Sequence, residues 1–534
     1  MDEHIDVIVV GGGTAGCVLT RRLHDAGRTV ALLEAGGDDT NPAIHEPSRM
    51  HELWHSPEDW DYSSVPQAHA GGRTLHLPRG KVLGGSHALN GMIFVRCAPE
   101  DFDGWADAGD GAWAWKEVLP LYKGLERFDR GGSELRGGEG LLDVVRDYRI
   151  NPIQTAIIAA AVSAGIPFND DYNGESLEGV SQQQITFRDG KRLTTYGAFV
   201  RPILGSPGLR VERGCWVHRL LLDGDRVVGV EVEQDGEMGS LLADEVVLCA
   251  GAIDSPRILL RSGIGPADEL SELGIPVVVD SPEVGRELQD HFLTPVIFTT
   301  DAKPVPEIEE GMGLMQTHLF WKSRPELAVP DTQPVHFSKP MYEEWMSGPE
   351  SGFTLMGGLI APKSRGSVRL SGPDPHDPVL IDLNMFTDEE DLDTMLASVR
   401  LCERVGAASP LSDEWGARQL YPDPAADDEA LRDYIRRTTV TYHHVAGSCR
   451  MGADAEAVVD PRLAVNGVRG LRVADASIMP TITSGNTNAP CMVIGELAAR
   501  FVLADAGSQG TPRQGTGVLL REAARRHGIR GRHV

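Results

Sequence analysis

The beginning of the chain alternates between short apolar runs and glycine-rich or polar breaks. Residues 5–10, IDVIVV, form a continuous apolar run, which is typical of a β-strand buried on both faces. Residues 14–27 have apolar positions three or four apart and end in Gly27, which predicts an amphipathic helix and its stop. A second apolar run at 29–33 predicts another buried strand. The pattern therefore predicts a strand–helix–strand unit.

The loop between the first strand and the helix is rich in glycine. Gly11, Gly13 and Gly16 have the G-x-G-x-x-G spacing. In this motif the glycines permit a tight turn, the approach of a pyrophosphate and close packing of the helix. Glu34 lies 18 residues after Gly16, where a carboxylate can accept hydrogen bonds from ribose hydroxyls. These features predict a dinucleotide site, with NAD and FAD as the alternatives.

Size and charge narrow the class of protein. A chain of 534 residues is too long for one ordinary core, so we expect two domains. No apolar run reaches about 18 residues, so no membrane span is expected. The net charge of −28 argues against nucleic acid and anionic membranes as partners. The start, MDEHIDVIVVGGG, lacks a basic region before its apolar run, so we expect a cytoplasmic protein.

Cysteines and the end of the chain add two further expectations. The seven cysteines are scattered and never spaced as CxxC, so we expect neither a disulfide framework nor a metal site. Residues 507–534 carry six arginines against one acid, Glu522, and form a predicted basic tail. Docking on the acidic body and binding a partner both stay open for this tail.

Three further stretches separate NAD from FAD. Residues 79–96 contain Gly84 and Gly85, which permit a backbone to lie against a flat ring. Asn90 and Gly91 then open an apolar, strand-like run. Residues 246–266 predict a buried strand, a turn at Gly251 and a helix that begins near Ser255–Pro256. Residues 471–502 form the third stretch, which ends in a predicted helix beginning near Pro490.

With these stretches the chain resembles the glucose–methanol–choline (GMC) oxidoreductases, FAD-dependent enzymes that act on alcohols. The resemblance spans residues 4–503 and is carried by the nucleotide loop, GGSHALNG, GAIDSPRILLRSGIGP, VGRELQDH, HHVAGSCRMG and NTNAP. It is strongest to the choline-dehydrogenase-like and hydroxymethylfurfural-oxidase-like branch. The resemblance implies FAD as the cofactor. Leu89 stands where some members carry a histidine bonded to FAD, so we expect non-covalent FAD.

The resemblance also implies which residues hold the cofactor. The ADP half is assigned to Gly11, Gly13, Thr14, Ala15, Gly16, Glu34 and Ala35, and the adenine end to Val217, Ala250 and Gly251. The flavin ring is assigned to Gly84, Gly85, Asn90, Gly91 and Met92, and its ribityl and pyrimidine side to Asp475, Ala476, Asn488, Ala489 and Pro490. A helix that begins near Pro490 would direct its positive end at the pyrimidine and favour reduction.

Two adjacent histidines lie far from the nucleotide loop, and the resemblance assigns them to the chemistry. Oxidation of an alcohol requires the hydroxyl proton to leave, and histidine suits a base near neutral pH. The family pattern places this base three residues before Gly447, at His444. In an extended stretch His443 would face the other way, in a pocket or supporting role. The second polar residue, ten before Glu496, is Asn486, for which a turn role stays open.

The predicted fold class is α/β, with a Rossmann-like FAD-binding domain and a substrate-binding cap that contains an antiparallel sheet. The FAD-binding domain is expected to be discontinuous, comprising residues 1–150, 208–300 and 430–506, with 151–207 and 301–429 forming the cap. Alternation at 367–386 predicts antiparallel strands. Aromatic residues at 318–356 suit an uncharged or aromatic alcohol. The candidate pocket residues are His443, Phe320, Trp321 and Phe337, whereas Trp54, Trp60, Trp105, Trp113 and Trp115 are expected to pack under loops.

The resulting hypothesis is FAD-dependent oxidation of a small-molecule alcohol, primary and uncharged or aromatic, to an aldehyde or ketone. Electrons would pass to O₂, giving H₂O₂, or to a quinone-like acceptor. A hydroxynitrile-lyase-type enzyme with FAD and a non-catalytic flavin-binding protein are the alternatives. The sequence leaves the alcohol, the acceptor and the oligomeric state open.

Overall fold

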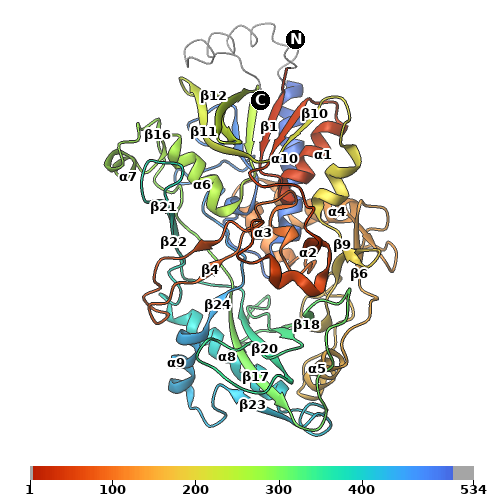
Figure 1. The fold of residues 1–534 in the computed structure, drawn as a ribbon. Helices are drawn as coiled ribbons and strands as arrows, with labels where there is room; N and C mark the ends of the chain where they lie inside the picture. The colour runs from red at the N-terminus through yellow and green to blue at the C-terminus, as the bar shows by residue number, and fades with distance from the viewer. Residues whose placement is uncertain (1–3, 509–534) are drawn as a thin grey trace.

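Two large sheets lie at opposite ends of the molecule (Figure 1). The structure, a computed structural model, describes residues 4–508. A parallel sheet lies near the amino terminus of the chain, and an antiparallel sheet lies at the other end (Figure 1). The predicted α/β class with an antiparallel second part is confirmed.

The parallel sheet is built from segments that are far apart along the chain. Its strand order is β10 (Leu209–Glu212), β2 (Val30–Leu33), β1 (Val7–Val10), β14 (Glu245–Leu248) and β25 (Leu471–Val473). The strands β1 and β2 are buried along their whole length, as expected of a sheet covered on both faces. The helix α1 (Thr14–Asp25) joins them, so the predicted strand–helix–strand unit is present.

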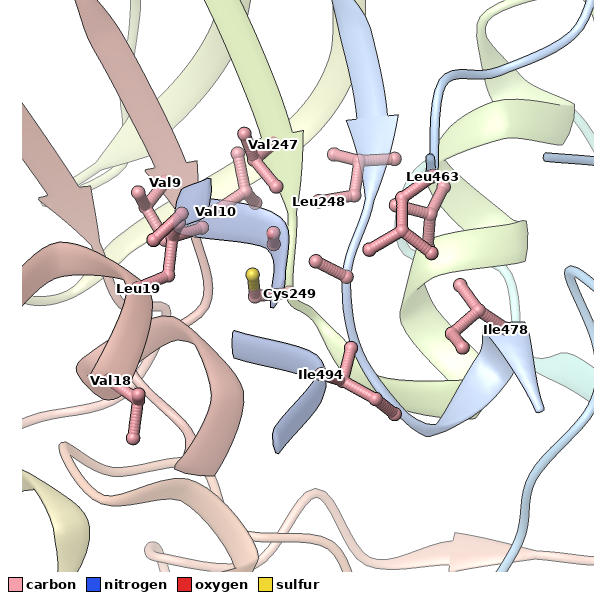
Figure 2. Packing of buried hydrophobic residues seen from close by; sticks show 14 of the residues in the cluster. Val9, Val10, Val18, Leu19, Val247, Leu248, Cys249, Leu463, Ile478 and Ile494 are labelled. Atoms are coloured by element: carbon pink, nitrogen blue, oxygen red, sulfur yellow. The ribbon is translucent and has the colours of Figure 1, made fainter. Parts of the chain in front are cut away.

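The helix α10 (Asn488–Ser508) packs against α1 beside this sheet. Figure 2 shows Val9, Val247 and Ile494 among the buried apolar side chains of this core. Gly495 permits the close contact, since a Cβ there would lie 2.5 Å from the carbonyl oxygen of Ala15. The helix α10 is thereby held against α1.

The second sheet is antiparallel and has seven strands. Its order is β23 (Ala417–Tyr421), β17 (Phe292–Thr300), β20 (Gly352–Leu359), β19 (Val335–Phe337), β18 (Met315–Phe320) and β7 (Gly179–Gln182), with β24 (Val440–Thr441) also paired to β17. The helix α8 (Glu389–Gly406) packs on β20 and β17 and contacts α5 (Pro152–Ser163) and α9 (Asp428–Thr438). Both β17 and β20 are buried throughout, so this sheet carries a core of its own.

Smaller elements connect the two parts. Three strands form a sheet beside the parallel one, namely β11 (Cys215–Asp223), β12 (Arg226–Gln234) and β13 (Glu237–Leu242). A mixed sheet contains β5 (Glu126–Phe128), β6 (Leu142–Val145), β8 (Ile185–Arg188) and β9 (Lys191–Arg192). The strand pairs are β3 (Tyr62–Ser63) with β4 (His76–Leu77), β15 (Ile264–Gly265) with β16 (Val279–Asp280), and β21 (Ser367–Leu370) with β22 (Val379–Asp382). The remaining α-helices are α2 (Pro42–His45), α3 (Pro99–Asp107), α4 (Trp115–Leu125), α6 (Gly251–Arg261) and α7 (Ala267–Glu272).

Several local predictions differ from the structure. The apolar run after Gly91 is not a strand and makes one isolated bridge, between Ile93 and Ile185. The helix α6 begins at Gly251 instead of Ser255, because Gly251 has φ +88° and turns the chain directly into the helix. The antiparallel strands predicted at 367–386 are present as β21 and β22.

The division into domains stays a prediction. Its boundary at residue 300 does not follow sheet membership, because β17 belongs to the antiparallel sheet. An apolar run predicts a buried strand but does not indicate which sheet the strand joins.

Two further expectations concern the basic tail and a membrane-spanning helix. The predicted basic tail, apart from the last turn of α10, lies outside the described residues. Among residues 4–508, no helix combines the length and apolar character that crossing a lipid bilayer requires.

Candidate active site

A cavity of about 490 Å³ lies where the two large sheets face each other. Four parallel strands deliver wall residues at or just past their carboxyl ends, namely Gly11, Glu34, Cys249 and Asp475. The antiparallel sheet contributes Leu293, Pro295, Met315, Phe337 and Met356. Ligands of open α/β sheets bind outside the carboxyl ends of the strands. The cavity therefore joins the predicted nucleotide site to an apolar compartment.

Most of the predicted cofactor residues meet in this cavity. Those on its wall are Gly11, Gly13, Thr14, Ala15, Glu34, Ala35, Gly85, Asn90, Gly91, Val217, Ala250, Gly251, Asp475, Ala476 and Asn488. Those that do not line it are Gly16, Gly84, Met92, Ala489 and Pro490. Gly16 instead lies behind the wall, where a Cβ would approach the carbonyl oxygen of Gly11 to 2.0 Å. Its role is close packing of α1 on the first loop.

Glu34 is held at the nucleotide end by backbone donors. Its Oε2 accepts from the Gly12 N–H and its Oε1 from the Gly36 N–H, each at 2.8 Å. Burial raises the pKa of this carboxyl to about 7. Each carboxylate oxygen keeps a further lone pair. Glu34 can therefore accept hydrogen bonds from ribose hydroxyls, as the motif predicts.

Two further observations fit a dinucleotide. No side chain caps the start of α1 at Gly13, so the N–H groups of the first turn are open to a phosphate. Asn488 accepts a hydrogen bond from Thr14 at 2.6 Å through Oδ1, yet its buried Nδ2 has no partner among the residues that the structure describes. A buried donor without a partner is costly unless a ligand or water meets it. The residues present therefore fit the predicted cofactor.

His444 and Asn486 are brought together on the wall of the cavity. The His444 Nε2 lies 3.1 Å from the Asn486 amide nitrogen. The Asn486 Oδ1 accepts from the Gln333 amide at 2.9 Å, which orients the Asn486 amide group. The His444 backbone N–H donates to Asp290 at 2.8 Å, which fixes the main chain here. A substrate at this wall would meet an imidazole and an amide side by side.

A third histidine, His291, orients the imidazole from the other side. Its Nδ1 lies 3.0 Å from the His444 Nδ1, and the two rings are nearly perpendicular. If Asn486 donates to the His444 Nε2, the His444 Nδ1 carries the proton and donates to His291. This arrangement leaves the Nε2 lone pair facing Asn486 and the cavity. The sequence analysis missed His291, although it closes the VGRELQDH block.

The electrostatic surroundings keep His444 neutral. Burial lowers its pKa well below 6.5, and the neighbouring His291, His443 and Arg79 lower it further. Tyr442 stacks on the ring with centroids 4.4 Å apart. A neutral imidazole is the form that can accept a proton, through the Nε2 lone pair that faces Asn486 and the cavity.

His443 departs from the expected extended geometry. Its φ of +64° lies in the left-handed region, so the two histidines do not alternate between faces. Both of them line the cavity. The His443 ring packs edge-on against Trp54, with centroids 5.4 Å apart. The placement of His443 in a pocket role is therefore consistent with the structure, for a different geometric reason.

The predicted pocket aromatics divide into two groups. Phe337 lines the cavity, whereas Phe320 and Trp321 do not, so these two assignments are wrong. Phe320 is fully buried in a separate cluster with Tyr172. Trp321 lies six residues beyond Met315, about 20 Å along the strand direction, away from the cavity.

Two tryptophans that were expected to pack under loops line the cavity instead. These are Trp54 and Trp60. Trp105 and Trp113 are fully buried in the core, as predicted. Aromatic residues in loops give no periodic pattern from which their direction can be read.

Comparison with known proteins identifies the family. Residues 5–293 and 362–495 match family models described as GMC oxidoreductase. The chain is 37% identical to "Alcohol dehydrogenase [acceptor]" of Pseudomonas putida, with 93% of this chain and 95% of the relative covered. It is 35% identical to "Oxygen-dependent choline dehydrogenase" of Brucella suis biovar 1 (strain 1330), with the same coverage. The crystal structure of pyridoxine 4-oxidase from "Mesorbium loti" superposes with a TM-score of 0.89 at 34% identity, covering 93% of this chain and 99% of that one. The chain belongs to the GMC oxidoreductase family.

Proposed function

We propose that this protein binds FAD and oxidises a primary, uncharged or aromatic alcohol to the aldehyde, with His444 as the proton acceptor. The observation that carries the proposal is the position of the His444 imidazole, held beside Asn486 in the same cavity as the nucleotide loop. Relatives named alcohol dehydrogenase, choline dehydrogenase and pyridoxine 4-oxidase support this class of reaction.

His444, Asn486 and His291 have separate roles in the proposed reaction. The His444 Nε2 takes the hydroxyl proton of the bound alcohol, which an unassisted alcohol does not release near neutral pH. The Asn486 amide hydrogen-bonds the substrate oxygen as negative charge develops on it. His291 holds the His444 ring in place through Nδ1. Bound FAD supplies the two-electron acceptor for the carbon-bound hydrogen.

The compartment beyond His444 suits an uncharged substrate. Its wall carries mostly apolar side chains, namely Leu293, Met315, Phe337, Met341, Met356 and Tyr442. Apolar walls with a few placed polar groups are typical of small-molecule sites. The acidic Glu343 also lines the cavity, so choline belongs in any substrate panel as a cationic comparison.

The FAD is proposed to be held without a covalent bond. Leu89 occupies the position where some family members attach it, and this side chain offers no nucleophile. Acid denaturation should release the yellow colour into solution.

The decisive experiment is anaerobic mixing of the holoenzyme with benzyl alcohol, pyridoxine, choline and simple aliphatic alcohols. Bleaching of the oxidised flavin by at least one uncharged alcohol is expected. His444→Asn should slow bleaching by about 100-fold or more, because the proton acceptor is lost. His443→Asn is the matched control, since it changes the adjacent buried histidine. If His444→Asn retains the full rate, the base is assigned wrongly.

The two alternative functions predict different products and flavin spectra. A hydroxynitrile-lyase-type enzyme would release cyanide and aldehyde from a cyanohydrin while the flavin spectrum stays unchanged. A non-catalytic flavin-binding protein would show neither bleaching nor cyanide release. An oxygen electrode then separates O₂ from a quinone-like dye as the acceptor.

A further inference from the structure

A second cluster of ligating side chains lies at the nucleotide end of the cavity, remote from His444 in sequence. It comprises His218 on β11, Glu233 on β12 and His376 in the connection between β21 and β22. One potential ligand atom from each residue lies within 4.8 Å of the other two. The catalytic proposal does not use these residues.

The spacing of the three atoms fits a tetrahedral metal ion. The Glu233 Oε2 lies 3.1 Å from the His218 Nε2 and 3.4 Å from the His376 Nε2. Zinc binds histidine nitrogen and carboxylate oxygen at about 2.0–2.2 Å, which places tetrahedral neighbours about 3.4 Å apart. The two imidazole rings are perpendicular, at 86°, with centroids 5.9 Å apart. Both Nε2 atoms lie near the same Glu233 oxygen, so the three atoms can ligate one ion.

The buried member of the cluster is His218, which also lines the cavity. The His218 side chain is only 3% exposed, and its Nε2 makes no hydrogen bond within residues 4–508. Glu233 faces it at ion-pair distance. A buried nitrogen that makes no hydrogen bond but faces two further side chains able to ligate a metal fits an ion site.

Another cluster of three potential ligands has a geometry that does not suit a metal ion. His55, Asp61 and His76 also bring three ligand atoms together. Their imidazoles, however, stack at 3.9 Å with an angle of only 23°. The His76 Nε2 is already bonded to Asp59 at 3.0 Å. Face-to-face rings do not direct their lone pairs to one point, so this cluster serves as a control.

We propose that His218, Glu233 and His376 bind one Zn²⁺-class divalent ion, with solvent completing the coordination. The ion would tie the β21–β22 connection to the β11–β12 hairpin. Pro375, next to His376, lines the cavity and accepts a hydrogen bond from Arg257 through its carbonyl. Trp216 packs edge-on against both imidazoles, at 4.7 and 5.1 Å. An ion here would hold the segment that carries Pro375 against the β11–β12 hairpin, at one wall of the nucleotide end.

The test uses untagged, chelator-treated holoenzyme and does not depend on turnover. Titration with Co²⁺ should give one equivalent of tight binding, with tetrahedral absorption at longer wavelength than the flavin bands. Zn²⁺ should displace the Co²⁺ and raise the melting temperature, because it binds the folded state. Metal analysis after dialysis against Zn²⁺ should give one zinc per chain.

Single substitutions decide which residues hold the ion. His376→Ala and Glu233→Gln should each weaken Co²⁺ binding by more than about 10-fold and abolish the Zn²⁺-dependent melting shift. His376 has a side chain that is 63% exposed, so its replacement is compatible with folding, and unchanged flavin content verifies this. His55→Ala should bind Co²⁺ like the wild type. Absence of Co²⁺ binding to the wild type, or its retention in His376→Ala, would overturn the proposal.

Discussion

The reactivity of the His444 imidazole depends on the two side chains that contact its ring nitrogens. Asn486 and His291 contact its two ring nitrogens, so both the tautomer and the direction of the ring are determined by neighbours. In enzymes, small displacements of a base reduce the rate strongly. At the residue scale, orientation of His444 matters as much as its identity.

Replacement of His291 tests this orientation. His291→Phe fills the same buried space but removes the acceptor for the His444 Nδ1–H, so we expect kcat to fall about 10- to 100-fold. The KM and the flavin content should change much less, because His291 does not line the cavity. His291→Asn, which restores an acceptor, should recover part of the rate. Equal loss in both variants would argue for a packing role alone.

At the element scale, the contact between α1 and α10 joins the two ends of the nucleotide site. The helix α1 begins beside Gly13, and α10 begins at Asn488, which is bonded to Thr14. Their separation is set by Gly495, where α10 touches the backbone of Ala15. Any side chain at this position must push the two helices apart.

Gly495→Ala is therefore expected to destabilise the protein by about 1–3 kcal/mol through overpacking. It should also weaken FAD retention, because the first turns of α1 and α10, which face the cofactor site, would move. Gly104→Ala in α3 is the control, since a Cβ there meets nothing within 4 Å. That change should be neutral or stabilising by up to about 1 kcal/mol. Chemical denaturation of both variants measures the difference, and equal midpoints would contradict the packing argument.

At the scale of the whole molecule, the cavity wall combines two unlike sheets. The parallel sheet supplies backbone donors and carboxylates, and the antiparallel sheet supplies apolar side chains. Many titratable groups are consequently buried in their neutral forms. The stability of the fold should depend on pH for this reason.

Buried histidines contribute strongly to that dependence. Burial lowers their pKa to about 3 in His87, His291, His318, His336 and His443. Their unfolded pKa is about 6.5, so between these values the unfolded chain binds more protons. The free energy of unfolding therefore decreases as the pH falls below about 6.5.

Buried carboxyls with a raised pKa oppose this effect in part. Burial raises the pKa of Glu34 to about 7 and those of Asp101 and Asp290 to about 6. They bind more protons in the folded state, which favours folding as the pH falls towards about 4. Other buried acids, including Asp39, Asp254, Asp391, Asp475 and Glu496, also have a raised pKa and act in the same direction as these three. We expect the histidines, His444 included, to outweigh the acids, because the interval from about pH 7 to pH 5 spans the pKa of an unfolded histidine. The urea midpoint should therefore be lower at about pH 5 than at about pH 7. A higher midpoint at about pH 5 would show that the carboxyls dominate.

The sequence by itself determined the nucleotide half of the protein. The glycine spacing, the flanking apolar runs and Glu34 lie within one short segment, and the structure places them as expected. Such features are local, because a strand and the helix that follows it adopt their geometry from neighbouring residues. The placement of His444 beside Asn486 came from the family resemblance.

Only the tertiary structure decided which distant side chains meet. His291 and His444 are 153 residues apart in sequence, and their contact depends on the antiparallel pairing of β17 with β24. Strand register likewise placed Phe337 in the cavity and Phe320 in a separate core. The cluster of His218, Glu233 and His376 requires three segments to converge. Strand order and register are properties of the whole fold, and periodicity along the chain does not specify them.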